Sequence, residues 1–153
     1  MAIAKCAVIG AGVMGSGIAA QIANAGVKVT LLDIVPPKAN NRNVIAEGAI
    51  EKMLKTDPAP FMSPRAARLI TPGNIEDDMG RLADCDWIVE AVLEKIEIKH
   101  ATYAKIAGAR KAGSIVSSNT QALPGWNSRV SLPTRKWQLA GTISGMEDWC
   151  SRL

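Results

Sequence analysis

The sequence is poor in aromatic residues and contains a single histidine. Its 153 residues include one Phe, one Tyr, four Trp and one His. Proteins that hold single-stranded nucleic acid stack the bases on aromatic side chains along a basic groove. The 18 Lys and Arg residues form no clustered stripe and are not interleaved with aromatic residues. The net charge of +4 therefore does not indicate a nucleic-acid partner.

Long apolar runs and closely spaced cysteines are also missing. No apolar run reaches the roughly eighteen residues of a membrane-spanning helix, and the N-terminal apolar run stops at Gly10 without a cleavage site. We expect neither a membrane span nor a secretory signal. Cys6, Cys85 and Cys150 lie too far apart for a closed disulfide framework, and no C-x-x-C pair indicates a metal site. A cytoplasmic protein is the expectation.

What is present fits one globular domain of the α/β class. Hydrophobic residues make up 48% and charged residues 21% of a chain that is too short for two full domains. Short strands alternate with helices, which predicts a doubly wound parallel sheet. The predicted strands are 3–9, 27–32, 68–70, 87–92 and 114–118; the predicted helices are a stretch through Ile18 and Ile22 that ends at Gly26, then 40–55 and 96–109.

Glycine, serine and proline mark the expected boundaries of these elements. Gly26 is placed to end the first helix in the left-handed conformation. Ser63 precedes Pro64, a pattern typical of a helix N-cap with proline at the first helical position. Residues 71–74, Thr-Pro-Gly-Asn, predict a turn after the short third strand.

Three glycines follow the first predicted strand and open the first predicted helix. Gly10, Gly12 and Gly15 have the G-x-G-x-x-G spacing of a dinucleotide-binding turn. The first glycine allows the tight turn, the second lets the backbone approach a pyrophosphate, and the third lets helix and strand pack closely. Free N–H groups at the helix N-terminus would face the phosphates. Glycines also mark ordinary turns, but the flanking strand and helix favour the dinucleotide site.

An acidic residue ends the second predicted strand. Asp33 stands eighteen residues after Gly15, where a carboxylate accepts hydrogen bonds from the adenosine ribose. It would repel a 2′-phosphate, so NAD is favoured over NADP. Arg42, nine residues further on, could complicate this preference; we place Arg42 on the helix that follows.

Four motifs occur in order along the chain: VIGAGVMGSGIA at 8–19, LLD at 31–33, DWIVEAVLE at 86–94 and SSNT at 117–120. Together they resemble the NAD-binding domain of the 3-hydroxyacyl-CoA dehydrogenases, over residues 3–120. Segments 53–62 and 71–78 are similar to the long bacterial fatty-acid oxidation proteins that join this dehydrogenase to an enoyl-CoA hydratase. The resemblance implies a Rossmann domain that binds NAD, an acyl-CoA substrate, a homodimer, and oxidation of 3-hydroxyacyl-CoA to 3-oxoacyl-CoA in fatty-acid β-oxidation.

The resemblance also implies three contacts near the nicotinamide end of the cofactor. Glu94 and Lys99 match a Glu and a Lys of the family that contact the cofactor there, and Asn119 matches the Asn of the family's Ser-Asn-Thr-Ser. From the residues alone, a solvated helix start is the favoured interpretation of Glu94 and Lys99. Asn119 fits an ordinary turn.

The family's catalytic base has no counterpart in this sequence. The resemblance implies a histidine base, oriented by a carboxylate, in a His-Phe-x-x-Pro motif on the strand after Ser-Asn-Thr-Ser. Here Gln121 follows Thr120, and neither that motif nor the family's helical domain is found. The single histidine, His100, lies beside Lys99 on a predicted helix and fits a solvated surface residue. We assign no catalytic residue.

The sequence changes character after Thr120. Residues 121–153 hold three of the four tryptophans and half of the net charge, without a clear period. We divide the chain into a Rossmann domain, 1–120, incomplete at its C-terminal end, and a divergent tail, 121–153, for which a shifted reading frame or an early stop is our hypothesis. Two other functions stay open: a non-catalytic NAD-binding module that assembles through its tryptophans, and a 3-hydroxyacid-type dehydrogenase.

Overall fold

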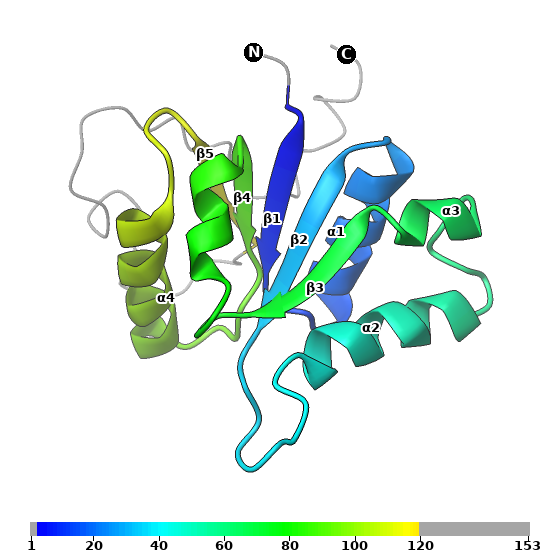
Figure 1. The fold of residues 1–153 in the computed structure, drawn as a ribbon, viewed down its shortest axis with the longest axis horizontal. Helices are drawn as coiled ribbons and strands as arrows, with labels where there is room; N and C mark the ends of the chain where they lie inside the picture. Colours follow the sequence, from blue (N-terminus) through cyan, green and yellow to red (C-terminus); the bar gives the residue numbers. More distant parts are fainter. Residues whose placement is uncertain (1–2, 120–153) are drawn as a thin grey trace.

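The computed structural model describes residues 3–119 and contains a five-stranded parallel sheet with the strand order β3-β2-β1-β4-β5 (Figure 1). The strands are β1 Lys5–Ile9, β2 Lys28–Asp33, β3 Ile70–Asn74, β4 Trp87–Glu90 and β5 Ile115–Ser118. The helices are α1 Val13–Asn24, α2 Val44–Lys55, α3 Pro64–Ala67, the 3-10 helix η1 Met79–Asp84 and α4 Ile96–Ala109. This is the α/β, Rossmann-like arrangement that the sequence predicts.

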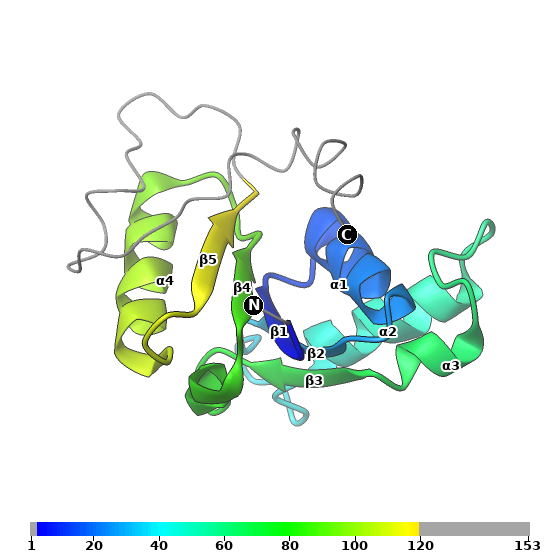
Figure 2. The same cartoon turned by 90° about the horizontal axis from the view of Figure 1, so that it is seen from above.

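Helices cover both faces of the sheet, as Figure 2 shows for α1 and α2 on one side and α4 on the other. Strand β1 supplies both layers because successive side chains of a strand point to opposite faces. Cys6 and Val8 pack with residues of α1, α2 and α3, whereas Ala7 and Ile9 pack with Tyr103 and other residues of η1 and α4. The two cores bury Cys6 to Ile9 of β1 and fix the register of the central strands.

The strand order reverses beside β1, which pairs with β2 on one side and with β4 on the other. Ile9 is level with Leu32 and with Glu90, so the three strands end together. Open α/β sheets bind ligands in the crevice outside the carboxyl ends of their strands at such a reversal. Asp33 and the glycine-rich loop lie at this edge of the sheet.

Several local predictions are confirmed. The helix at 96–109 has the predicted bounds, and Gly26 follows α1 with a φ of 81°. Ser63 caps α3: its side-chain oxygen accepts a hydrogen bond from the Arg65 N–H, with Pro64 at the first helical position. These signals are local, so the surrounding structure changes them little.

The predicted strand 68–70 and turn 71–74 are wrong, because β3 runs from Ile70 to Asn74. Proline lacks the N–H that a central strand needs, so a turn was expected around Pro72. Among the described strands β3 lies at the end of the sheet and pairs with β2 alone, where Pro72 sits opposite Leu31. An edge position tolerates proline, and this explains the difference. Strand β4 also ends at Glu90, two residues earlier than predicted.

Helix α2 begins at Val44 instead of residue 40, so Arg42 lies in the loop before the helix and the placement of Arg42 on the helix is wrong. The Asn41 side chain accepts a hydrogen bond from the Asn43 N–H at 3.0 Å, a local turn that competes with helix formation. The Asn43 side chain in turn accepts from the Asn74 amide at 2.7 Å. Both contacts hold the loop in a non-helical form.

Within residues 3–119 no helix is both long and apolar enough to cross a membrane. The same part of the chain brings no three His, Cys, Asp or Glu residues together as candidate metal ligands. Our hypotheses on the tail, 121–153, lie outside the described residues.

Candidate dinucleotide site

The glycine-rich loop begins with a tight turn at Gly10. This residue has a φ of 106°, a conformation that side-chain-bearing residues rarely adopt, and its N–H donates to the Leu32 carbonyl at 2.7 Å. A Cβ at Gly10 would lie 2.4 Å from the backbone oxygen of Ala91. Glycine is therefore required here both by the backbone conformation and by the close approach of the segment after β4.

The other two glycines have opposite surroundings. A Cβ at Gly15 would lie 1.8 Å from the Gly10 carbonyl oxygen, so the start of α1 packs directly on the turn. A Cβ at Gly12 would meet nothing within 4 Å. Gly12 is the N-cap of α1 and is exposed, and its side of the loop opens towards solvent. A pyrophosphate can approach the backbone from that side.

The start of α1 has the electrostatic character of an anion site. No acidic residue lies in its first turn, and no side chain caps it. The first N–H groups of a helix lack partners within the helix and carry the positive end of its dipole. This end of α1 therefore favours a negatively charged group beside Gly12.

Asp33 connects the end of β2 to the glycine-rich loop. Its Oδ2 accepts a hydrogen bond from the Ala11 N–H, and its Oδ1 accepts from the Ile34 N–H at 2.6 Å. Each carboxylate oxygen has a second acceptor position, so these bonds leave capacity for ribose hydroxyls. The loop and the carboxylate are thus positioned against each other at the carboxyl edge of the sheet.

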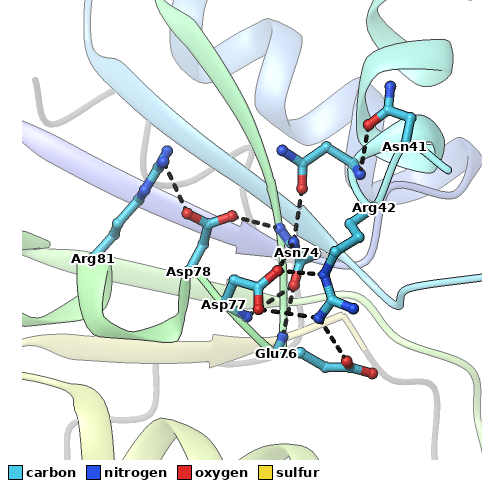
Figure 3. Close-up of polar contacts among 8 residues, drawn as sticks. Asn41, Arg42, Asn74, Glu76, Asp77, Asp78 and Arg81 are labelled. Atoms are coloured by element: carbon cyan, nitrogen blue, oxygen red, sulfur yellow. Dashed lines mark hydrogen bonds and ion pairs between the residues drawn. The ribbon is translucent and has the colours of Figure 1, made fainter.

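An ion-pair network lies at the end of β3, where Asn74 is level with Asp33 of β2. Figure 3 shows this network. Arg42 Nε donates to Asp77 Oδ2 at 2.6 Å, and Arg42 Nη2 donates to Asp77 Oδ1 at 3.0 Å and to Glu76 Oε2 at 2.9 Å. The buried Asn74 donates to Asp77 Oδ2 at 2.9 Å. These donors hold the pKa of the Asp77 carboxyl below its usual range, and the two carboxylates raise the pKa of Arg42.

A second network, at the ends of β4 and β5, is buried. Glu90 and Lys99 both have fully buried side chains, and Lys99 Nζ lies 2.8 Å and 3.1 Å from the two Glu90 carboxylate oxygens. The same carboxylate accepts from the Ser118 hydroxyl at 2.7 Å and from the Val92 N–H at 2.9 Å. The Glu90 backbone carbonyl accepts from the Asn119 N–H at 2.7 Å.

Tyr103 of α4 lies beside the buried carboxylate. Burial and the nearby Glu90 raise the pKa of Tyr103 to about 12, although a hydrogen bond with Ser118 acts in the opposite direction. The phenol therefore stays protonated at physiological pH. It belongs to the packed interface between α4 and the sheet.

The structure brings Gly10, Gly12, Gly15 and Asp33 together in one loop region. Glu94 lies in the exposed segment between β4 and α4, and Asn119 directly follows β5. Lys99 does not belong to a solvated helix start, because its side chain is fully buried against Glu90.

Glu90 and the residues around Arg42 were not predicted as part of the site. The signal for Glu90 was a charged residue at the end of an apolar strand, since such a residue is rarely buried without a partner. The segment from Glu76 to Asp78 has three acidic residues in a row, but their link to Arg42, 34 and 35 positions away, depends on the tertiary structure.

The parallel sheet with its reversal at β1, the glycine-rich loop and the acidic end of β2 define a dinucleotide-binding domain of the Rossmann type. Residues 5–128 match the family described as "3-hydroxyacyl-CoA dehydrogenase, NAD binding domain". The chain belongs to this family.

Individual relatives agree with the family. The chain is 51% identical to a probable 3-hydroxyacyl-CoA dehydrogenase of Deinococcus radiodurans, over 81% of this chain and 36% of that protein. It is 45% identical to a Rickettsia felis protein provisionally named a fatty acid oxidation complex trifunctional enzyme, over 86% of this chain and 18% of that protein. The crystal structure of 3-hydroxybutyryl-CoA dehydrogenase from Escherichia coli K12 is similar with a TM-score of 0.64 and 25% identity, covering 80% of this chain and 26% of the other. The chain thus spans about a third or less of each of these proteins.

Proposed function

We propose that residues 3–119 bind NAD with its pyrophosphate at the loop of Gly10, Gly12 and Gly15 and its adenosine ribose at Asp33. The open side of Gly12 at the start of α1 is the observation that carries this proposal, because a bound phosphate needs backbone N–H groups that no side chain covers. Asp33 supports it, since its carboxylate is aligned with the loop through Ala11.

We further propose that the cofactor serves oxidation of 3-hydroxyacyl-CoA to 3-oxoacyl-CoA in fatty-acid β-oxidation. The relatives named above support this reaction. This chain spans 36% of the Deinococcus radiodurans protein and 18% of the Rickettsia felis protein. Removing hydride from a carbinol carbon also requires a base for the hydroxyl proton. His100 lies on the exposed side of α4, and we give it no catalytic role. The proposal assigns cofactor binding alone to the described residues.

At the nicotinamide end, the proposal places Glu94, Lys99 and Asn119 near the cofactor. Glu94 and Asn119 follow the carboxyl ends of β4 and β5, on the ligand-binding edge of the sheet. The amino group of Lys99 is engaged with Glu90 and fully buried. A direct contact from Lys99 therefore requires this amino group to turn away from Glu90.

The test is calorimetric titration of the 153-residue chain with NAD⁺ and NADP⁺, together with an assay of acetoacetyl-CoA-dependent loss of NADH absorbance. We expect saturable binding of NAD⁺ that is tighter than binding of NADP⁺. The absence of NAD⁺ binding would contradict the proposal. Binding without turnover agrees with a cofactor-binding role. Turnover by this chain would mean that it contains a catalytic base that we have not assigned.

A further inference from the structure

We propose that Glu76 and Asp77 determine the cofactor preference, because they hold Arg42 away from the position where NADP carries its 2′-phosphate. This inference rests on the proposed binding of the adenosine ribose at Asp33. It assigns a specificity role to residues outside the glycine-rich loop.

The Arg42 guanidinium is engaged by two carboxylates at once. Its Nε and Nη2 form three hydrogen bonds, of 2.6 Å, 2.9 Å and 3.0 Å, with Asp77 and Glu76. The pair with Asp77 uses two parallel N–H donors, the geometry in which arginine recognises carboxylates and phosphates most strongly. Three of the five N–H donors of the guanidinium, including the parallel pair, are thus engaged by carboxylates of the same chain.

The network lies beside the proposed ribose position. Asp33 and Asn74 are level with each other at the ends of β2 and β3, and the Ile75 N–H donates to the Asp33 carbonyl at 2.9 Å. Glu76 and Asp77 follow two and three residues after Asn74, and Figure 3 shows their carboxylates and the Arg42 guanidinium beside Asn74 at this corner of the sheet edge.

Asn74 keeps the two acidic residues in place. Its side chain is buried, with 2% of the residue exposed. Its Oδ1 accepts from the N–H groups of Glu76 at 3.0 Å and Asp77 at 2.8 Å, while its Nδ2 donates to Asp77 Oδ2. The backbone of both residues and the carboxylate of Asp77 are therefore held by Asn74, and Arg42 meets a preformed partner in Asp77.

The charges at this corner disfavour a 2′-phosphate. The carboxylates of Asp33, Glu76, Asp77 and Asp78 outnumber the guanidinium groups of Arg42 and Arg81 by two. Arg42 is nevertheless half exposed, with 47% of its side chain accessible, so it can turn towards a ligand once its partners are neutral. NADP recognition in Rossmann domains uses an arginine at this end of the cofactor.

The experiment compares binding of NAD⁺ and NADP⁺ to the wild-type chain and to the double variant Glu76→Gln/Asp77→Asn by calorimetry. Both positions are exposed, so we expect the variant to fold, and far-UV circular dichroism checks this. The ratio of the NADP⁺ to the NAD⁺ dissociation constant should fall about tenfold, the effect of one new hydrogen bond to a charged group. An unchanged ratio would overturn the inference.

Two control variants separate Arg42 from general charge. The double variant Glu51→Gln/Asp84→Asn removes the same two charges from exposed ion pairs with Lys55 and Lys5 and should leave the ratio unchanged. The triple variant Arg42→Gln/Glu76→Gln/Asp77→Asn should lose the gain in NADP⁺ affinity. A gain that persists in the triple variant would overturn the role of Arg42. Failure of the wild-type chain to bind NAD⁺ would overturn the proposed function and this inference together.

Discussion

The two halves of the sheet's carboxyl edge each contain an ion pair, but one pair is exposed to solvent and the other is buried. At the ends of β2 and β3, Arg42 and Asp77 form an ion pair in which about half of each side chain is exposed. At the ends of β4 and β5, Glu90 and Lys99 form an ion pair with no exposed side-chain surface. Both ion pairs connect a strand end to another element, but only the first can be reached by a ligand without rearrangement.

Because the two ion pairs differ in burial, we expect one to affect ligand binding and the other to affect folding stability. Exposed ion pairs contribute little to folding because water and salt screen them, so their charges are free to select a ligand. A buried pair has little net effect on stability when complete, but losing one partner leaves an uncompensated charge in the interior. We therefore expect substitutions at the first network to change cofactor binding and substitutions at the second to change the free energy of unfolding.

The sharpest test of the comparison is Glu90→Gln. The neutral amide leaves the buried Lys99 ammonium without its counter-charge, which should lower the free energy of unfolding by about 3–5 kcal/mol. Urea unfolding followed by circular dichroism measures this effect. The double variant Glu90→Gln/Lys99→Met removes both charges and should recover most of the loss. Equal destabilisation of the single and double variants would show that the uncompensated Lys99 charge is not the cause of the loss.

A smaller loss of stability is expected at Gly15 of the glycine-rich loop. In Gly15→Ala, the new Cβ meets the Gly10 carbonyl oxygen at 1.8 Å, so the turn must shift. We expect a cost of about 1–3 kcal/mol in urea unfolding.

Gly12→Ala is the matched control, because its Cβ enters open space. This variant should unfold close to the wild-type midpoint and yet bind NAD⁺ more weakly, since the methyl group occupies the side from which the pyrophosphate approaches. Equal effects of the two substitutions on unfolding would contradict the assignment of Gly15 to packing and of Gly12 to cofactor binding.

At the exposed half of the edge, Asp33→Asn should act on binding more than on stability. The substitution removes the charge that accepts from the Ala11 N–H and that we propose as the ligand of the ribose hydroxyls. Hydrogen bonds to charged groups contribute roughly 1.5–3 kcal/mol, so we expect NAD⁺ affinity to fall about tenfold or more by calorimetry. Asp84→Asn, at the opposite edge of the sheet, controls for loss of a carboxylate. Unchanged NAD⁺ affinity would count against Asp33 as the ribose ligand.

The sequence predicts features that depend on neighbouring residues and misses those that depend on tertiary partners. The turn at Gly10, the acidic end of β2 and the helix at 96–109 follow from short patterns, and the structure has them. The third strand was predicted too early, at 68–70, because Pro72 is tolerated in β3 only through its place at the end of the described sheet.

The same reason applies to the candidate site. Glu90 and Lys99 meet only because α4 packs against β4, and no pattern within the eight residues between them indicates burial of both charges. Arg42 and Asp77 are likewise joined by the path of the loop before α2. The residue types were visible in the sequence, whereas their partners were set by the packing of distant elements.

A third ion pair, at the opposite edge of the sheet, tests whether the loss of stability on removing a charge increases with the burial of the pair. Asp86 pairs with Lys111, with 14% and 35% of their side chains exposed, and accepts from the N–H groups of Ala4 at 2.8 Å and Lys5 at 3.1 Å. The Lys111 ammonium and these donors lower the pKa of Asp86 to about 2. Since the pKa is lower in the folded chain, the stabilisation is complete above the ordinary pKa and is lost as the pH falls towards 2.

The difference in unfolding free energy between the wild type and Asp86→Asn should therefore be constant near neutral pH and shrink between about pH 4 and pH 2. Urea midpoints measured across this range check it, with Asp84→Asn as an exposed control. We expect the effect to be smaller than that of Glu90→Gln, because water reaches Lys111 and screens its charge. An Asp86→Asn effect as large as that of Glu90→Gln would mean that hydrogen bonding to the carboxylate, and not burial, sets the order of the three ion pairs.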